Sequence, residues 1–146
     1  MSHRDHDTSS LRNCASTSSI YYFVVAQNQL HGSLPSDVSP TLPNLEIFYG
    51  GVNSFPGLIF VSLSNASRLG HLAFDQNDLS GIVPQNLGSL RDLVHLNFQG
   101  NRLGNGRVDD LNFLNVLANL TSLETLSLGC NQFGGVLPST RGKLSS

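Results

Sequence analysis

Charged residues are scarce in this chain of 146 residues, at 12% against a typical share of about 25%. The net charge is −2 and the pI is near 6.1, so the chain lacks the basic surface that nucleic acid or an anionic membrane would attract. Long apolar runs are also missing, and none approaches the roughly 18 residues of a membrane span. We therefore predict no nucleic-acid partner and no membrane-spanning segment in this chain.

Motifs for catalysis, metal binding and targeting are absent as well. The sequence contains no G-x-S-x-G, H-E-x-x-H or C-x-x-C pattern. His3-Arg4-Asp5 matches only the start of the kinase catalytic loop, because Ser10 stands where that loop has its asparagine. The first residues mix charges and have no apolar core, so they do not resemble a signal peptide. We predict no catalytic residue, no metal site and no cofactor.

What the chain does have is an asparagine that recurs at regular intervals among apolar residues. One copy of the pattern, Leu69-x-x-Leu72-x-Phe74-x-x-Asn77-x-Leu79, lies near the middle. The recurring asparagines are Asn28, Asn53, Asn77, Asn101 and Asn131, at intervals of 25, 24, 24 and 30 residues. Such a pattern, with a period of roughly 20–29 residues, indicates a leucine-rich repeat solenoid. Solenoids present extended surfaces for binding other molecules.

Five repeat units can be aligned on these asparagines, and they cover residues 20–44, 45–68, 69–92, 93–122 and 123–146. Residues 1–19 are predicted to be a disordered tail or the remnant of a preceding repeat. The fold class is an α/β repeat solenoid, with a concave parallel sheet and with 3-10 or short helices on the convex side. Cys14 and Cys130 then lie too far apart for a disulfide, so we expect both thiols to be free.

The alternation of strand side chains assigns the apolar residues of each repeat to the core. The predicted core columns are Phe23, Phe48, Leu72, Leu96 and Leu126, then Val25, Gly50, Phe74, Phe98 and Leu128, then Leu30, Phe55, Leu79, Leu103 and Phe133. Gly50 is expected to leave its slot empty, at a cost of about 1 kcal/mol or more. The recurring asparagines are expected to hydrogen-bond the turn backbone of their own and neighbouring coils.

The fourth unit is longer than the others because of an insertion at residues 104–110. After it, four leucines follow at i, i+3 spacing: Leu111, Leu114, Leu117 and Leu120. The aspartate that directly precedes them, Asp110, is a helix N-cap signal. We predict a short helix here, on the convex side of the solenoid.

The repeat also carries an extension, N-x-L-x-G-x-[ILV]-P-x-x-L-G-x-L, which in the third unit reads from Asn77 to Leu90. Together with residues 62–67, 103–114 and 131–138, it resembles the ectodomain of plant leucine-rich repeat receptor-like serine/threonine kinases of the immune-receptor type. The resemblance covers about residues 11–146. It implies the plant extracellular form of the repeat, in which a second row of strands lies beside the concave sheet.

By this resemblance the chain is part of an ectodomain and acts as a non-catalytic module that recognises a peptide or protein ligand in immune or developmental signalling. The resemblance also implies a leucine-rich repeat co-receptor and a place at the extracellular face of the plasma membrane. The signal peptide, membrane span and kinase domain of the family are not found in this chain. Two alternatives remain open: a secreted inhibitor of cell-wall hydrolases and a nonfunctional truncated gene product.

Outward strand positions are expected to line the concave face and to contact the ligand, because Tyr and His combine an apolar body with a polar tip. The predicted ligand-binding residues are Tyr22, Val24, Ile47, Tyr49, His71, Asp75, His95, Asn97 and Gln99. Two sequons share one repeat phase, Asn65-Ala66-Ser67 and Asn119-Leu120-Thr121. Asn65 and Asn119 are therefore predicted glycosylation sites if the chain is secreted.

Overall fold

Five short parallel strands at the repeated L-x-L positions form the larger sheet of the protein. The computed structural model describes residues 19–34, 36 and 42–139. Its larger sheet contains, in spatial order, β1 (Tyr22–Val24), β2 (Ile47–Tyr49), β4 (His71–Ala73), β6 (His95–Asn97) and β8 (Thr125–Ser127). The predicted solenoid is confirmed. The predictions for residues 1–18, Cys14 included, concern residues outside the described part, as do residues 140–146 of the fifth unit.

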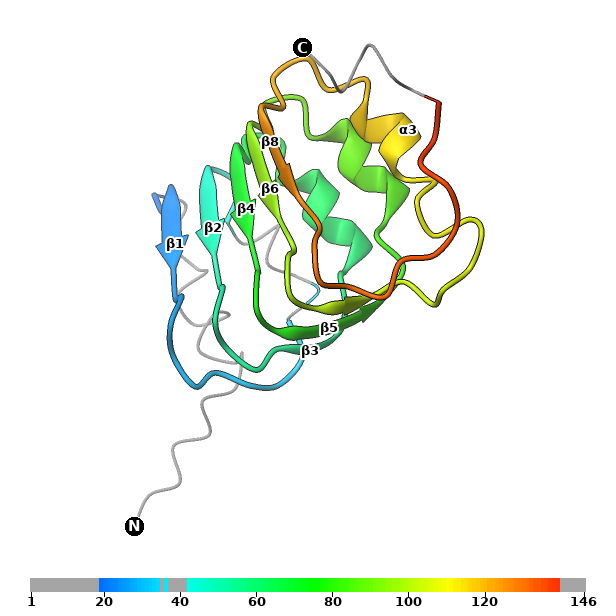
Figure 1. Cartoon of the computed structure of the whole chain (residues 1–146). Coiled ribbons are helices and arrows are strands. Elements are labelled where there is room, and N and C mark those ends of the chain that lie inside the picture. The colour runs from blue at the N-terminus through cyan, green and yellow to red at the C-terminus, as the bar shows by residue number, and fades with distance from the viewer. Residues whose placement is uncertain (1–18, 35, 37–41, 140–146) are drawn as a thin grey trace.

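In the described residues, a second, smaller sheet and short helices complete the coils. The smaller sheet contains β3 (Pro56–Leu58), β5 (Asp78–Gly81) and β7 (Arg102–Leu103), all parallel. The helices are η1 (Val61–Asn65) and η2 (Gln85–Ser89), which are 3-10 helices, and the single α-helical turn α3 (Leu114–Leu117). Figure 1 shows the helices on the side of the core opposite the larger sheet, with the smaller sheet along one edge.

The helix predicted after the insertion is shorter than expected and has a different start. Residues 108–113 form turns, and only Leu114–Leu117 are α-helical. Phe113 occupies the N-cap position, and no side chain caps the helix there. The prediction that Asp110 is the N-cap was wrong, because its carboxylate accepts hydrogen bonds from the backbone of other segments instead.

The strands of the larger sheet pair without any slip, so equivalent positions of the repeats stack into columns. Phe23 pairs with Phe48, Phe48 with Leu72, and Leu72 with Leu96. The inward columns are buried in the middle repeats and partly buried in the outer ones. Four phenylalanines are almost completely buried, at 1% exposure: Phe48, Phe55, Phe74 and Phe98. They form the centre of the hydrophobic core.

Gly50 lies in this core without leaving a cavity. A Cβ atom added to Gly50 would overlap the Phe74 ring, with Cδ1 of that ring only 2.9 Å away. The ring of Phe74 also packs edge-on against Phe48, with the ring centroids 4.8 Å apart. The predicted empty slot was therefore wrong: the third repeat fills the space that the second repeat leaves.

We predict that Gly50→Ala destabilises the fold instead of filling a void. The added methyl group would displace a buried ring, and overpacking of this kind costs about 1–3 kcal/mol. The change is measured as the urea unfolding midpoint of the variant against the wild type. The control is the same substitution in a Phe74→Leu background. Gly50→Ala should cost less there than in the wild type, because the smaller side chain at position 74 leaves room for the added methyl group. An increase in stability on Gly50→Ala would contradict the packing of Phe74 against Gly50.

The asparagine side chains join each coil to the one before it. Asn77 Nδ2 donates to the Phe74 carbonyl of its own coil at 3.2 Å and to the Gly50 carbonyl of the preceding coil at 3.0 Å. Its Oδ1 accepts from the N–H of Phe55 at 3.0 Å. Asn53, Asn101 and Asn131 form the equivalent bonds. Asn28 is exposed, and the bonds described for it reach only its own coil.

We predict that Asn101→Ala destabilises the protein far more than Asn28→Ala. Asn101 is only 7% exposed, so its removal leaves the Leu79 N–H without its partner, and a buried unsatisfied group costs about 1–3 kcal/mol. The Phe74 carbonyl also loses the shorter of its two donors and keeps only Asn77. Removal of the exposed Asn28 leaves its carbonyl partners accessible to water, so the expected loss is below about 1 kcal/mol. Urea unfolding of both variants measures the difference. Similar losses for the two substitutions would show that the bonds between coils contribute little.

Candidate functional site

The outward side chains of the larger sheet form a continuous surface, here called the sheet face. It is defined by two columns and two flanking residues: Tyr22, Ile47, His71, His95 and Thr125; Val24, Tyr49, Ala73, Asn97 and Ser127; Asp75 and Gln99. All nine residues predicted to bind ligand belong to the sheet face.

Three of these residues form a contiguous group on the sheet face, in which His71 contacts both Tyr49 and His95. The rings of His71 and His95 stack with their centroids 6.1 Å apart and an angle of 29° between their planes. The Tyr49 ring packs edge-on against His71, and its hydroxyl lies 3.4 Å from His71 Nδ1. Tyr22 and Val24 lie apart on β1 and are 65% and 58% exposed. The structure therefore brings the central predicted residues together and leaves the first strand open to solvent.

A hollow of about 350 Å³ lies beside this aromatic group. Its lining residues are Ala26, Gln27, Tyr49, Gly51, Val52, Ala73, Asp75, His95 and Asn97. Three small residues are among those that line the hollow. Ala26 and Gly51 lie just beyond the ends of β1 and β2, and Ala73 is the last residue of β4. Tyr49, Asp75, His95 and Asn97 were predicted from the sequence as ligand-binding residues, whereas Ala26 and Gly51 were missed. The signal that could have found Ala26 and Gly51 is their shared position, two residues after the paired Val24 and Tyr49.

Two lining residues, Gln27 and Val52, have a left-handed backbone conformation, with φ of 58° and 56°. A β-branched residue such as Val52 adopts this conformation rarely. Gln76 and Cys130 have the same conformation at the equivalent place, directly before the recurring asparagine. The left-handed conformation is therefore a property of the turn in each repeat, and it is not evidence for a binding site at the hollow.

The two sequon asparagines lie on the helical side of the solenoid. Asn65 ends η1 and Asn119 follows α3, and both residues are exposed. The larger sheet lies on the other side of the core (Figure 1). Glycans at these two positions would leave the sheet face uncovered.

Metal-binding clusters and membrane-spanning helices are not found in the described part of the chain. No group of three or more His, Cys, Asp or Glu side chains is placed to hold a metal ion in residues 19–34, 36 and 42–139. Within the same ranges, no helix has the length and apolar character needed to cross a bilayer. Cys130 is an exposed free thiol.

Comparisons with known proteins identify the type of repeat. The Leucine Rich Repeat family model matches residues 122–144. Receptor-like protein 14 of Arabidopsis thaliana is 32% identical over 78% of this chain, and a putative receptor-like protein kinase of the same plant is 40% identical over 77% of it. The Arabidopsis receptor kinase HAESA, solved in complex with the peptide hormone IDA and the co-receptor SERK1, superposes with a TM-score of 0.79 at 31% identity over 90% of this chain.

This chain is a leucine-rich repeat domain of the plant receptor-like kinase and receptor-like protein type. It spans only a small part of these relatives: 14% of receptor-like protein 14, 11% of the putative kinase and 21% of the solved HAESA chain. The matches cover the leucine-rich repeat ectodomain, and no kinase domain is matched in this chain.

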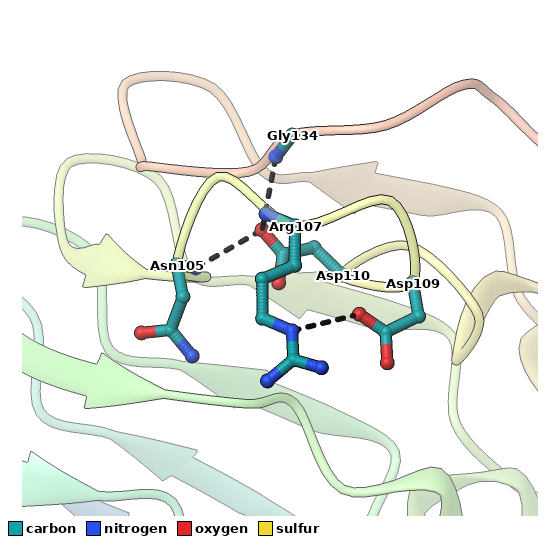
Figure 2. A network of polar contacts seen from close by, with 5 residues as sticks. All are labelled: Asn105, Arg107, Asp109, Asp110 and Gly134. Atoms are coloured by element: carbon teal, nitrogen blue, oxygen red, sulfur yellow. Dashed lines mark hydrogen bonds and ion pairs between the residues drawn. The ribbon is translucent and has the colours of Figure 1, made fainter.

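Apart from the sheet face, the leucine-rich repeat domain contains a network of polar contacts at the insertion of its fourth repeat (Figure 2). Oδ2 of Asp110 accepts hydrogen bonds from the N–H groups of Asn105, Arg107 and Gly134, at 3.0, 3.0 and 2.9 Å. Burial raises the pKa of the Asp110 carboxyl, but the N–H groups of Gly134, Asn105 and Arg107 outweigh it and the pKa lies below its ordinary value. The carboxylate thereby joins the insertion of the fourth repeat to the fifth repeat.

We predict that this junction weakens in acid. The folded-state pKa of Asp110 is lowered, so its contribution to stability is complete above the ordinary pKa of an aspartate, about 3.9, and is lost as the pH falls through the lowered value. Asp110→Asn should therefore lower the thermal unfolding midpoint at neutral pH, with a deficit that shrinks toward pH 2. The exposed neighbour Asp109, which pairs with Arg107 at 3.4 Å, provides the control variant Asp109→Asn. A deficit independent of pH would contradict this assignment.

Proposed function

We propose that this leucine-rich repeat domain is a non-catalytic recognition module that binds a peptide or protein ligand on its sheet face. The observation that supports this most directly is the group formed by Tyr49, His71 and His95 beside a hollow. Aromatic side chains with polar tips, arranged around a depression, are the residues in which binding energy concentrates. The structural likeness to HAESA, which was solved with a peptide hormone, supports the same class of ligand.

The cellular setting follows from the same family. As part of a receptor-like kinase or receptor-like protein, the domain would act on the extracellular side of the plasma membrane in immune or developmental signalling. A leucine-rich repeat co-receptor would join the complex, as SERK1 does in the HAESA structure. Asn65 and Asn119 would carry glycans on the helical side, which keeps the ligand surface free.

A peptide selection tests the proposal and requires no assumption about the sequence of the ligand. The domain, secreted from eukaryotic cells, is used to select binders from a phage-displayed library of random twelve-residue peptides. Selected peptides are then measured against Tyr49→Ala and His95→Ala, and we expect affinity losses of roughly 30-fold or more, as for other interface hot spots. Val61→Ala is the control, because Val61 is an exposed apolar residue, 55% accessible, on the helical side.

Two results would overturn the proposal. The first is a selection that enriches no peptide above a control solenoid of the same size. The second is a set of selected peptides that bind Tyr49→Ala and His95→Ala as tightly as the wild type. In that second case the ligand surface would lie elsewhere on the domain.

A further inference from the structure

The carboxylate of Asp75 is the only formal charge among the residues that line the hollow, with histidine taken as neutral. It lies over Gly51, where a Cβ atom would overlap Asp75 Oδ1. A side chain at position 51 would therefore push the carboxylate out of its place. Glycine at this outward position both deepens the hollow and lets the carboxylate reach into it.

This charge has no partner among the residues that the structure describes. Asp75 forms no side-chain hydrogen bond or ion pair with them. Three arginines are paired with other carboxylates, Arg68 with Glu46, Arg102 with Asp78 and Arg107 with Asp109, at 3.3, 3.3 and 3.4 Å. Arg91, the remaining described arginine, follows η2 on the helical side. No arginine in the described part of the chain therefore neutralises Asp75, which leaves its carboxylate open to a cation supplied by a ligand.

The remaining walls of the hollow suit a cationic side chain rather than an anionic one. The Tyr49 ring offers a π surface that attracts ammonium and guanidinium groups. The side-chain oxygen of Asn97 accepts from the Gln99 N–H at 3.0 Å, and it keeps a second lone pair as an acceptor. A carboxylate ligand would face the negative charge of Asp75 with no described arginine to offset it.

We propose that the hollow is a socket for an arginine or lysine side chain of the ligand, with Asp75 as the ion-pairing residue. This inference rests on the proposed function and specifies its ligand class: a peptide that presents a basic side chain to the centre of the sheet face. The bond between Asp75 and the ligand cation would form at a partly buried position, where charge pairs contribute more than at a fully exposed surface.

A small probe tests the socket separately from peptide recognition. N-acetyl-arginine amide is titrated into the isotope-labelled domain, and the backbone amide signals of Gly51, Ala73 and Asp75 are followed by NMR. N-acetyl-citrulline amide, which replaces the guanidinium by an uncharged urea group of the same shape, is the matched control. We expect saturable shifts with the arginine probe in the wild type and none with the citrulline probe or with Asp75→Asn.

The peptide selection supplies a second readout for the same assignment. Selected peptides should carry Arg or Lys at one shared position, and Asp75→Asn should weaken them roughly 10-fold or more. Exchange of that Arg or Lys for glutamine should produce a similar loss, and the two changes together should cost no more than one alone, because both remove the same interaction. Asp78→Asn is the control on the smaller sheet, and urea midpoints establish that both variants stay folded.

The outcomes separate the two proposals. The socket proposal is wrong if the selected peptides bind the sheet face without a basic residue, or if they bind Asp75→Asn with the affinity of the wild type. Either result is compatible with peptide recognition. Arginine-specific shifts at Gly51 and Asp75 with no selectable peptide support the socket and overturn the peptide-recognition module. Equal shifts with the arginine and citrulline probes show that charge is not recognised, which overturns the socket.

Discussion

The hydrogen bonds of the asparagine side chains are the interaction on which the remaining structure depends. The turns that leave the larger sheet contain carbonyl groups that no neighbouring strand can satisfy, and Asn77 and Asn101 satisfy them from within the core. Because each amide also bonds the preceding coil, it fixes the separation of successive coils. With the coils held at that separation, the buried phenylalanines of successive repeats pack against one another.

Much of the fold was predictable because its signal is periodic. Each asparagine is accompanied by apolar residues at fixed offsets, so the inward columns could be read from spacing alone. Gly50 and Asp110 were misread because each depends on a residue from another repeat. The space beside Gly50 is filled by Phe74 of the following coil, and Asp110 binds Gly134 across a distance of 24 residues in the sequence. A pattern within one repeat contains no information about either contact.

The candidate site was predictable in outline for the same reason and unpredictable in shape. Alternation along the strands assigns Tyr49, His71 and His95 to one face, but it does not specify which of them touch. The hollow is lined by small residues from three successive coils, Ala26, Gly51 and Ala73. Its depth is thus a property of three neighbouring coils together. Such a depression becomes visible only when the register between strands is known.

The insertion in the fourth repeat has a consequence for how such domains diversify. The spacing of the asparagines widens from 24 to 30 residues there, yet His95 still pairs with Thr125 and Asn131 still bonds the Leu103 N–H at 2.9 Å. All of the additional chain is accommodated away from the larger sheet, where Asp110 secures it. Insertions can therefore accumulate on one flank through evolution while the opposite face keeps its geometry, so the two surfaces are free to acquire different partners independently.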